Sequence, residues 1–140
     1  MFSKYFNNWE VKPEFTKEFV SLFNGWLGVE NLHKLDQVTE DDWRKFGKLI
    51  VLISQKYEIL IAHCESQQCL PVNNVESIIQ TYSEAMKKDS TQFTKFVIPE
   101  LDCIFTEEWD STYIIWHKNN DAVQALQPLI NASGLHNFHD

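Results

Sequence analysis

Histidine and cysteine side chains in the middle of this chain could bind a metal. His63, Cys64 and Cys69 offer the imidazole and thiolate ligands that zinc prefers, and His136 and His139 could complete the set. Cys64, however, falls on an apolar helical stripe, where a free cysteine behaves as a small hydrophobic residue. The sequence also has no second closely spaced cysteine pair. We therefore expect no metal and no other cofactor, and keep a metal-binding domain built on His63, Cys64 and Cys69 as an alternative.

Carboxylates and a histidine near residue 110 could do acid-base chemistry. Glu107 and Glu108 precede His117, and two carboxylates in different surroundings can separate their pKa values. Adjacent residues of a strand point to opposite faces, however, so the two carboxylates cannot act on one bond. The chain also lacks a glycine-rich phosphate loop, a G-x-S-x-G motif and an H-E-x-x-H motif. The sequence thus predicts a protein that is not an enzyme, with a small enzyme using Glu108 and His117 as the alternative.

The same stretch is strongly acidic. The chain has a net charge of −8, and residues 99–140 contain seven acidic residues against one basic residue. Acidic side chains steer a basic partner into encounter, and an exposed aromatic ring can anchor it. The plainer alternative is that these residues are a solvated hairpin surface with the tryptophan packed on the sheet. We predict a partner-binding edge made by Glu100, Asp102, Glu107, Glu108, Trp109 and Asp110.

Charge and composition exclude other classes of function. A net negative chain is poorly suited to bind the phosphates of nucleic acids. The longest aliphatic run, 49–53, is too short to span a bilayer, and the N-terminal residues lack an apolar leader. Three scattered cysteines do not suggest a disulfide framework. We expect a cytoplasmic protein that binds neither nucleic acid nor membrane.

A long helix over 39–66 is the element that should organise the others. Thr39 and Asp42 form a capping-box pattern at its start. Its rival is a hairpin with strands at 49–53 and 58–62, but the intervening Ser54 to Lys56 lacks the residues of tight turns. Apolar residues then recur three and four positions apart on one helical face: Trp43, Phe46, Ile50, Ile53, Tyr57, Leu60 and Cys64.

The remaining elements follow from shorter patterns. We expect a first helix from Pro13 to Gly28, a third from Asn73 to Lys88 and a fourth from Asp121 to Ser133, the last kinked at Pro128. Alternation predicts a hairpin from Glu100 to His117, to which residues 135–138 add a third strand. Residues 90–98 fit a helix or a strand equally well. The predicted fold is α+β: one domain, 1–140, with about four helices around the long helix 39–66 and a small, mostly antiparallel sheet.

These observations favour a small acidic protein-binding domain whose partner is a basic protein. A small, acidic, aromatic-rich chain without catalytic machinery has the composition of immunity proteins that neutralise toxic nucleases. We therefore expect an immunity-type inhibitor of a basic toxin domain. An adaptor or regulatory subunit has the same profile, and neither the partner nor the oligomeric state follows from the sequence.

Overall fold

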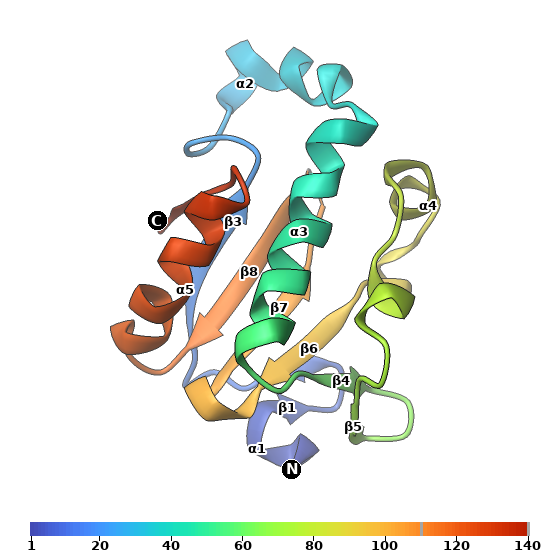
Figure 1. Cartoon of the computed structure of the whole chain (residues 1–140), viewed down its shortest axis with the longest axis vertical. Helices are drawn as coiled ribbons and strands as arrows, with labels where there is room; N and C mark the ends of the chain where they lie inside the picture. The colour runs from blue at the N-terminus through green and yellow to red at the C-terminus, as the bar shows by residue number, and fades with distance from the viewer. Residues whose placement is uncertain (110, 140) are drawn as a thin grey trace.

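The computed structural model describes residues 1–109 and 111–139. Its centre is a seven-stranded sheet in the order β5-β4-β6-β7-β8-β3-β9, with every neighbouring pair antiparallel (Figure 1). The strands are β3 (Thr16–Ser21), β4 (Leu60–His63), β5 (Gln68–Pro71), β6 (Lys95–Ile98), β7 (Cys103–Glu107), β8 (Thr112–His117) and β9 (His136–Phe138).

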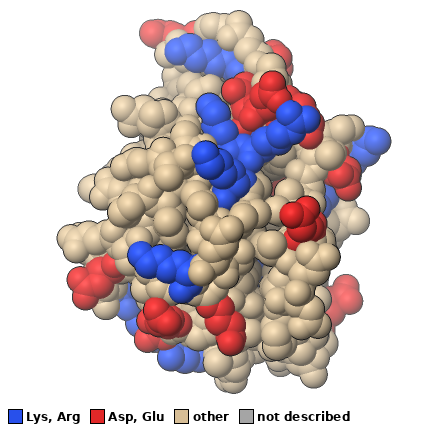
Figure 2. All heavy atoms as spheres, in the orientation of Figure 1, with Lys and Arg blue, Asp and Glu red and all other residues tan. Residues whose placement is uncertain are grey.

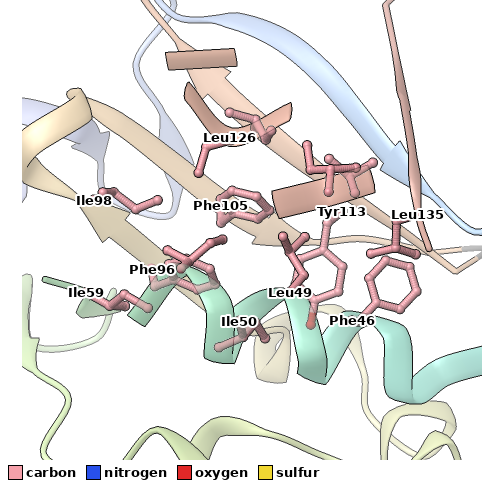
Figure 3. Close-up of a cluster of buried hydrophobic side chains, with 14 of the residues drawn as sticks. Phe46, Leu49, Ile50, Ile59, Phe96, Ile98, Phe105, Tyr113, Leu126 and Leu135 are labelled. Carbon is pink, nitrogen blue, oxygen red and sulfur yellow. The ribbon is translucent and has the colours of Figure 1, made fainter. Parts of the chain in front are cut away.

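Two helices cover one face of this sheet, which we call the helix face (Figure 1). They are α3 (Glu40–Lys56) and α5 (Asn120–Ala132). The three- and four-residue spacing of apolar residues gives each helix one buried stripe. Figure 3 shows Leu49 and Ile50 of α3 against Phe96, Phe105 and Tyr113 of the sheet. Phe96 and Phe105 stack in parallel, with ring centroids 5.0 Å apart, at the centre of this core.

The N-terminal segment covers part of the opposite face. It contains α1 (Phe2–Tyr5) and a two-stranded ribbon of β1 (Phe6–Asn7) and β2 (Glu10–Val11). Its buried rings make a second apolar cluster with Leu60, Val97 and Ile104 of β4, β6 and β7. The middle of the sheet is therefore buried on both faces.

Short elements fill the connections. Between β3 and α3 lie α2 (Gly28–Asn31) and the 3₁₀ helix η1 (Leu32–Gln37). Between β5 and β6 lie η2 (Val75–Ile78), α4 (Tyr82–Met86) and η3 (Ser90–Gln92), and η4 (Pro99–Leu101) leads into β7. Among the described residues, none of the helices combines the length and the apolar character that a membrane span requires.

The predicted architecture is wrong in its proportions, because the sheet dominates and the long helix is shorter than 39–66. The capping box of Thr39 and Asp42 starts α3 as predicted. The helix ends at Lys56, however, and Leu60 to His63 form β4, which pairs with β5 and β6. In β4, Leu60 joins the second cluster while Ile61 packs on the helix-face core. A strand buried on both faces has apolar residues in succession, and these continued the helical spacing by coincidence.

Other elements were predicted with mixed success. The expected first helix is instead strand β3, and the expected third helix is reduced to η2 and the five-residue α4. Strands β7 and β8 pair as the predicted hairpin, and the expected fourth helix is α5, which runs through Pro128 as one element. Residues 90–98 contain both η3 and β6. The C-terminal strand β9 pairs with β3 rather than with a strand of the hairpin.

Candidate functional site

The residues predicted to bind a partner lie at opposite ends of β7. Glu100 and Asp102 precede the strand, while Glu107, Glu108 and Trp109 lie at or beyond its far end. Four residue steps of a strand span about 13 Å, so the two groups do not form one continuous edge. Asp110 lies outside the described residues.

Asp102 anchors the N-terminal segment. Its backbone is left-handed, with φ of 49°. Its Oδ1 atom lies 2.7 Å from the Lys4 ammonium and 3.2 Å from the Tyr5 hydroxyl. The hydrogen bond from Lys4 holds the pKa of the Asp102 carboxyl below its usual range. Asp102 therefore already has a cationic partner within the chain, whereas Glu100 is exposed.

Glu107 is a buried anchor rather than a surface acid. Its side chain is 2% exposed and lies on the helix face. The Oε1 atom accepts hydrogen bonds from the Thr94 amide, at 2.8 Å, and from the Lys88 ammonium, at 3.1 Å. The Oε2 atom accepts one from the Gln80 side chain, at 2.7 Å. These bonds fasten residues 80–94 to β7, so Glu107 is not available to a partner protein.

Glu108 points to the opposite face of the sheet from His117. Its Oε2 atom accepts a hydrogen bond of 2.7 Å from the Thr106 hydroxyl, which in turn accepts one of 2.9 Å from the Trp116 indole. His117 belongs to the alternate set of β8 residues that faces the helices. Burial raises the pKa of the Glu108 carboxyl. Glu108 and His117 thus cannot act on one substrate, and the acid-base pair considered from the sequence is not assembled.

Trp109 is exposed beside an apolar hollow. Its side chain is 59% exposed, and its ring meets Phe93 edge-on, with centroids 4.7 Å apart. The hollow next to it has a volume of about 290 Å³. The apolar side chains in its lining are Leu35, Trp43, Tyr82, Ala85, Met86, Phe93 and Trp109. Met86, at the rim, is itself 53% exposed.

A second exposed tryptophan lies next to this region. Trp26 is 60% exposed and packs edge-on against Phe19 and Phe138, at centroid distances of 4.6 and 5.1 Å. It lines a hollow of about 130 Å³, and Leu35 lines both this hollow and the one beside Trp109. We call the combined surface the apolar end, consisting of Trp26, Leu32, Leu35, Met86, Phe93 and Trp109.

The sequence interpretation missed Trp26 as a surface loop residue, because it placed this residue within the helix expected from Pro13 to Gly28. The available signal was the pair of glycines around it. Gly25 and Gly28 both have positive φ angles, 114° and 67°. Two glycines three residues apart disfavour a helix and favour an irregular loop.

Charges surround the apolar end without forming one acidic patch. Residues 28–42 contain five acidic residues and one lysine. Figure 2 shows that most of the helix face is uncharged, with a group of basic side chains beside acidic ones in its upper part and separate acidic and basic side chains elsewhere. Most of the net negative charge comes from residues 99–140, but Asp102 and Glu107 are paired with Lys4 and Lys88, so the hairpin is not one free acidic patch.

The metal-binding alternative is not supported. Cys64 and Cys69 belong to the second apolar cluster, whereas His63 is exposed and alternates to the other face. The sheet order places β9, with His136, at the opposite edge from β4 and β5. Burial raises the pKa of both thiols, which makes them weak ligands. Within the described part of the chain, no three His, Cys, Asp or Glu side chains are grouped to hold a metal ion.

Comparison with protein-family models, with curated protein sequences and with solved structures finds no match to this chain. The functional argument therefore depends on the geometry and charge of the chain itself.

Proposed function

We propose that this protein is an acidic protein-binding domain that docks a basic protein partner through the apolar end. The observation that carries the proposal is the exposure of Trp26 and Trp109, each about 60% accessible, on either side of adjoining hollows. The particular form we propose is an immunity-type inhibitor that neutralises a basic toxin or nuclease.

The physical argument for a docking surface starts from the two exposed tryptophan rings. Tryptophan and methionine side chains are enriched at the centres of protein interfaces, where a few desolvated anchors supply most of the binding energy. Contiguous exposed apolar side chains that border hollows are typical of interaction sites. Both tryptophans pack against other rings, Trp26 on Phe19 and Trp109 on Phe93. They are therefore held in place before a partner arrives, which lowers the entropy cost of binding.

The argument for a basic partner is electrostatic. The net charge of −8 attracts a positively charged protein over about 8 Å at physiological ionic strength. Next to the apolar end, Asp36 is exposed and lines the hollow beside Trp109, whereas Asp41 is already paired with Arg44. Exposed rim charges of this kind increase the association rate and reject partners of the same sign.

Site-specific photocrosslinking in the native cell tests this proposal. The replacement Trp109→p-benzoyl-phenylalanine places a crosslinker at the apolar end. The matched control, Trp9→p-benzoyl-phenylalanine, changes a tryptophan that is 43% exposed on the N-terminal segment. We expect a discrete adduct with a basic protein from position 109 and none from position 9.

The outcome also separates the forms of the proposal. An adduct with a toxin or nuclease domain supports the inhibitor, whereas a basic subunit of a larger assembly supports an adaptor. Adducts of equal yield from both positions, or adducts only with acidic proteins, would reject the proposed docking surface.

A further inference from the structure

A pocket of about 420 Å³ lies at the N-terminal end of β3, away from the apolar end. Within the described residues, strand β9 pairs with residues 19–21 of β3, whereas residues 16–18 pair with β8 alone, with His139 beside Glu18. The start of α5 closes the pocket. We call it the Glu18 pocket, lined by Thr16, Lys17, Glu18, Phe19, His117, Asn120 and His139.

Glu18 places a nearly buried carboxylate in this pocket. Its side chain is 8% exposed. The Oε2 atom accepts a hydrogen bond of 2.8 Å from the Asn137 side chain, and the Oε1 atom lies 3.5 Å from the exposed His139 ring. Among residues 1–109 and 111–139, no lysine or arginine lies within ion-pair distance of Glu18. A carboxylate has about four lone-pair sites, so Glu18 retains capacity for a cationic donor.

His117 contributes a second acceptor. The residue is 6% exposed, and its Nδ1 atom lies 3.0 Å from the Asn119 carbonyl oxygen. A carbonyl can only accept, so Nδ1 carries a proton, and in the neutral form of the ring Nε2 carries a lone pair. Within the described chain, Nε2 makes no hydrogen bond, and no buried side-chain nitrogen is left without a partner. The Nε2 atom therefore keeps some exposure, and the His117 side chain lines the Glu18 pocket.

We propose that the Glu18 pocket binds an organic cation, an ammonium or guanidinium group, which donates hydrogen bonds to the Glu18 carboxylate and to His117 Nε2. An anion would meet a buried carboxylate and a lone pair, both of which repel it. A metal ion would need a third ligand, and the described residues do not provide a grouped set of three. An organic cation matches both acceptors and needs no further ligand.

Besides the exposed His139 ring, which can pair with Glu18, two neighbouring groups could compete for the pocket, and neither of these two does. The Lys17 ammonium lies over the Trp116 ring on the opposite face, 5.1 Å from its centroid, so it does not neutralise Glu18. The N-terminus of α5 attracts anions, but Asn119 caps the Asp121 amide and Asp121 supplies an acidic side chain in the first turn. Apart from the exposed His139 ring, the described residues therefore place no cationic group at Glu18.

Titration followed by NMR tests the proposal on the full chain. The probes are n-butylammonium and ethylguanidinium chloride, with 1-butanol as the neutral probe of similar shape and sodium chloride as the ionic-strength control. We expect saturable shifts of the His117 ring and Asn137 side-chain signals with the two cations alone. Glu18→Gln should weaken the apparent Kd by at least about tenfold, because a charged hydrogen bond is lost. The glutamine can still accept from Asn137, so folding should survive.

Matched controls make the result decisive. Glu14→Gln changes an exposed acid nearby and should keep the Kd within about twofold. Trp109→Ala should leave it unchanged, because the pocket and the apolar end are separate sites. Tighter binding of the peptide acetyl-Gly-Lys-Gly-amide than of n-butylammonium would identify the cation as a side chain of a partner, and weaker binding would identify a free small molecule. Absence of saturable shifts, shifts reproduced by 1-butanol, or shifts unaffected by Glu18→Gln would overturn the proposal.

Discussion

The Lys88 ammonium lies 3.1 Å from the Glu107 Oε1 atom and joins the outer segment 80–94 to strand β7. The Glu107 side chain is 2% exposed and that of Lys88 is 22% exposed. Met86 and Phe93 belong to the same outer segment. This ion pair therefore holds one side of the apolar end against the sheet.

The change Glu107→Gln should destabilise the protein. It leaves the Lys88 ammonium without its anion, and breaking a buried pair from one side costs about 3 to 5 kcal/mol. We expect the low end, about 3 kcal/mol, because Lys88 is partly exposed. Urea unfolding at neutral pH measures the loss, with Glu100→Gln as an exposed control that should stay within about 0.5 kcal/mol. Equal stability of the two variants would show that the ion pair is not an anchor.

Glu108 should make stability depend on pH in the direction opposite to that of an ion-paired acid. Burial raises the pKa of its carboxyl in the folded state above the unfolded value of about 4.3. The folded state therefore binds this proton more tightly. Glu108 therefore lowers the free energy of unfolding. This loss is complete above the pKa that the carboxyl has in the folded state, and it disappears as the pH falls to the pKa of the unfolded state.

Glu108→Gln tests this assignment, because its amide oxygen can still accept from Thr106. The variant should be more stable than the parent at pH 7, and the difference should shrink on acidification. Unfolding free energies at several pH values between 4 and 8 measure it, with Glu100→Gln as the control. A variant that is less stable than the parent at pH 7 would contradict the burial argument.

The two faces of the sheet should each contribute a core. Ile53, on α3, is 0% exposed, and Phe6, in the N-terminal segment, is 2% exposed. Ile53→Ala should cost about 2 to 5 kcal/mol and Phe6→Ala about 3 to 5 kcal/mol. Val29→Ala, at a residue that is 87% exposed, should be nearly neutral in the same unfolding assay. A neutral Phe6→Ala would mean that the N-terminal segment does not stabilise the second face.

Local signals in the sequence predicted some elements well. The capping box of Thr39 and Asp42 acts within one helical turn, so its residues alone locate the start of α3. Strands β3 and β4 were missed because both of their faces are occupied. In β3, Val20 joins the helix-face core while Phe19 packs on Trp26 on the other side, and alternation between apolar and polar residues is lost. The pairing of β3 with both β8 and β9 depends on contacts about 100 residues apart in the chain.

One residue of the apolar end, Trp109, was also named from the sequence as part of a partner-binding edge. Trp109 was identified as a possible anchor because it is the aromatic residue among the acids. The burial of Glu107 could not be anticipated, because its partners Gln80 and Lys88 come from a segment that the sequence places in a separate helix. The same limitation applies to Glu18, whose neighbour His117 is distant in sequence and adjacent in the sheet.

The most direct test of the central claim is the binding kinetics of the captured basic partner with the purified protein. Trp109→Ala should increase the dissociation rate and weaken binding by about 2 kcal/mol or more, as truncation of an interface anchor does. Trp9→Ala, which removes an exposed tryptophan elsewhere, should leave the kinetics unchanged. Reversal of Asp36 to lysine should mainly slow association and reduce its salt dependence. Docking through the apolar end would be contradicted if the partner bound the Trp109→Ala variant with the same affinity and the same dissociation rate as the parent.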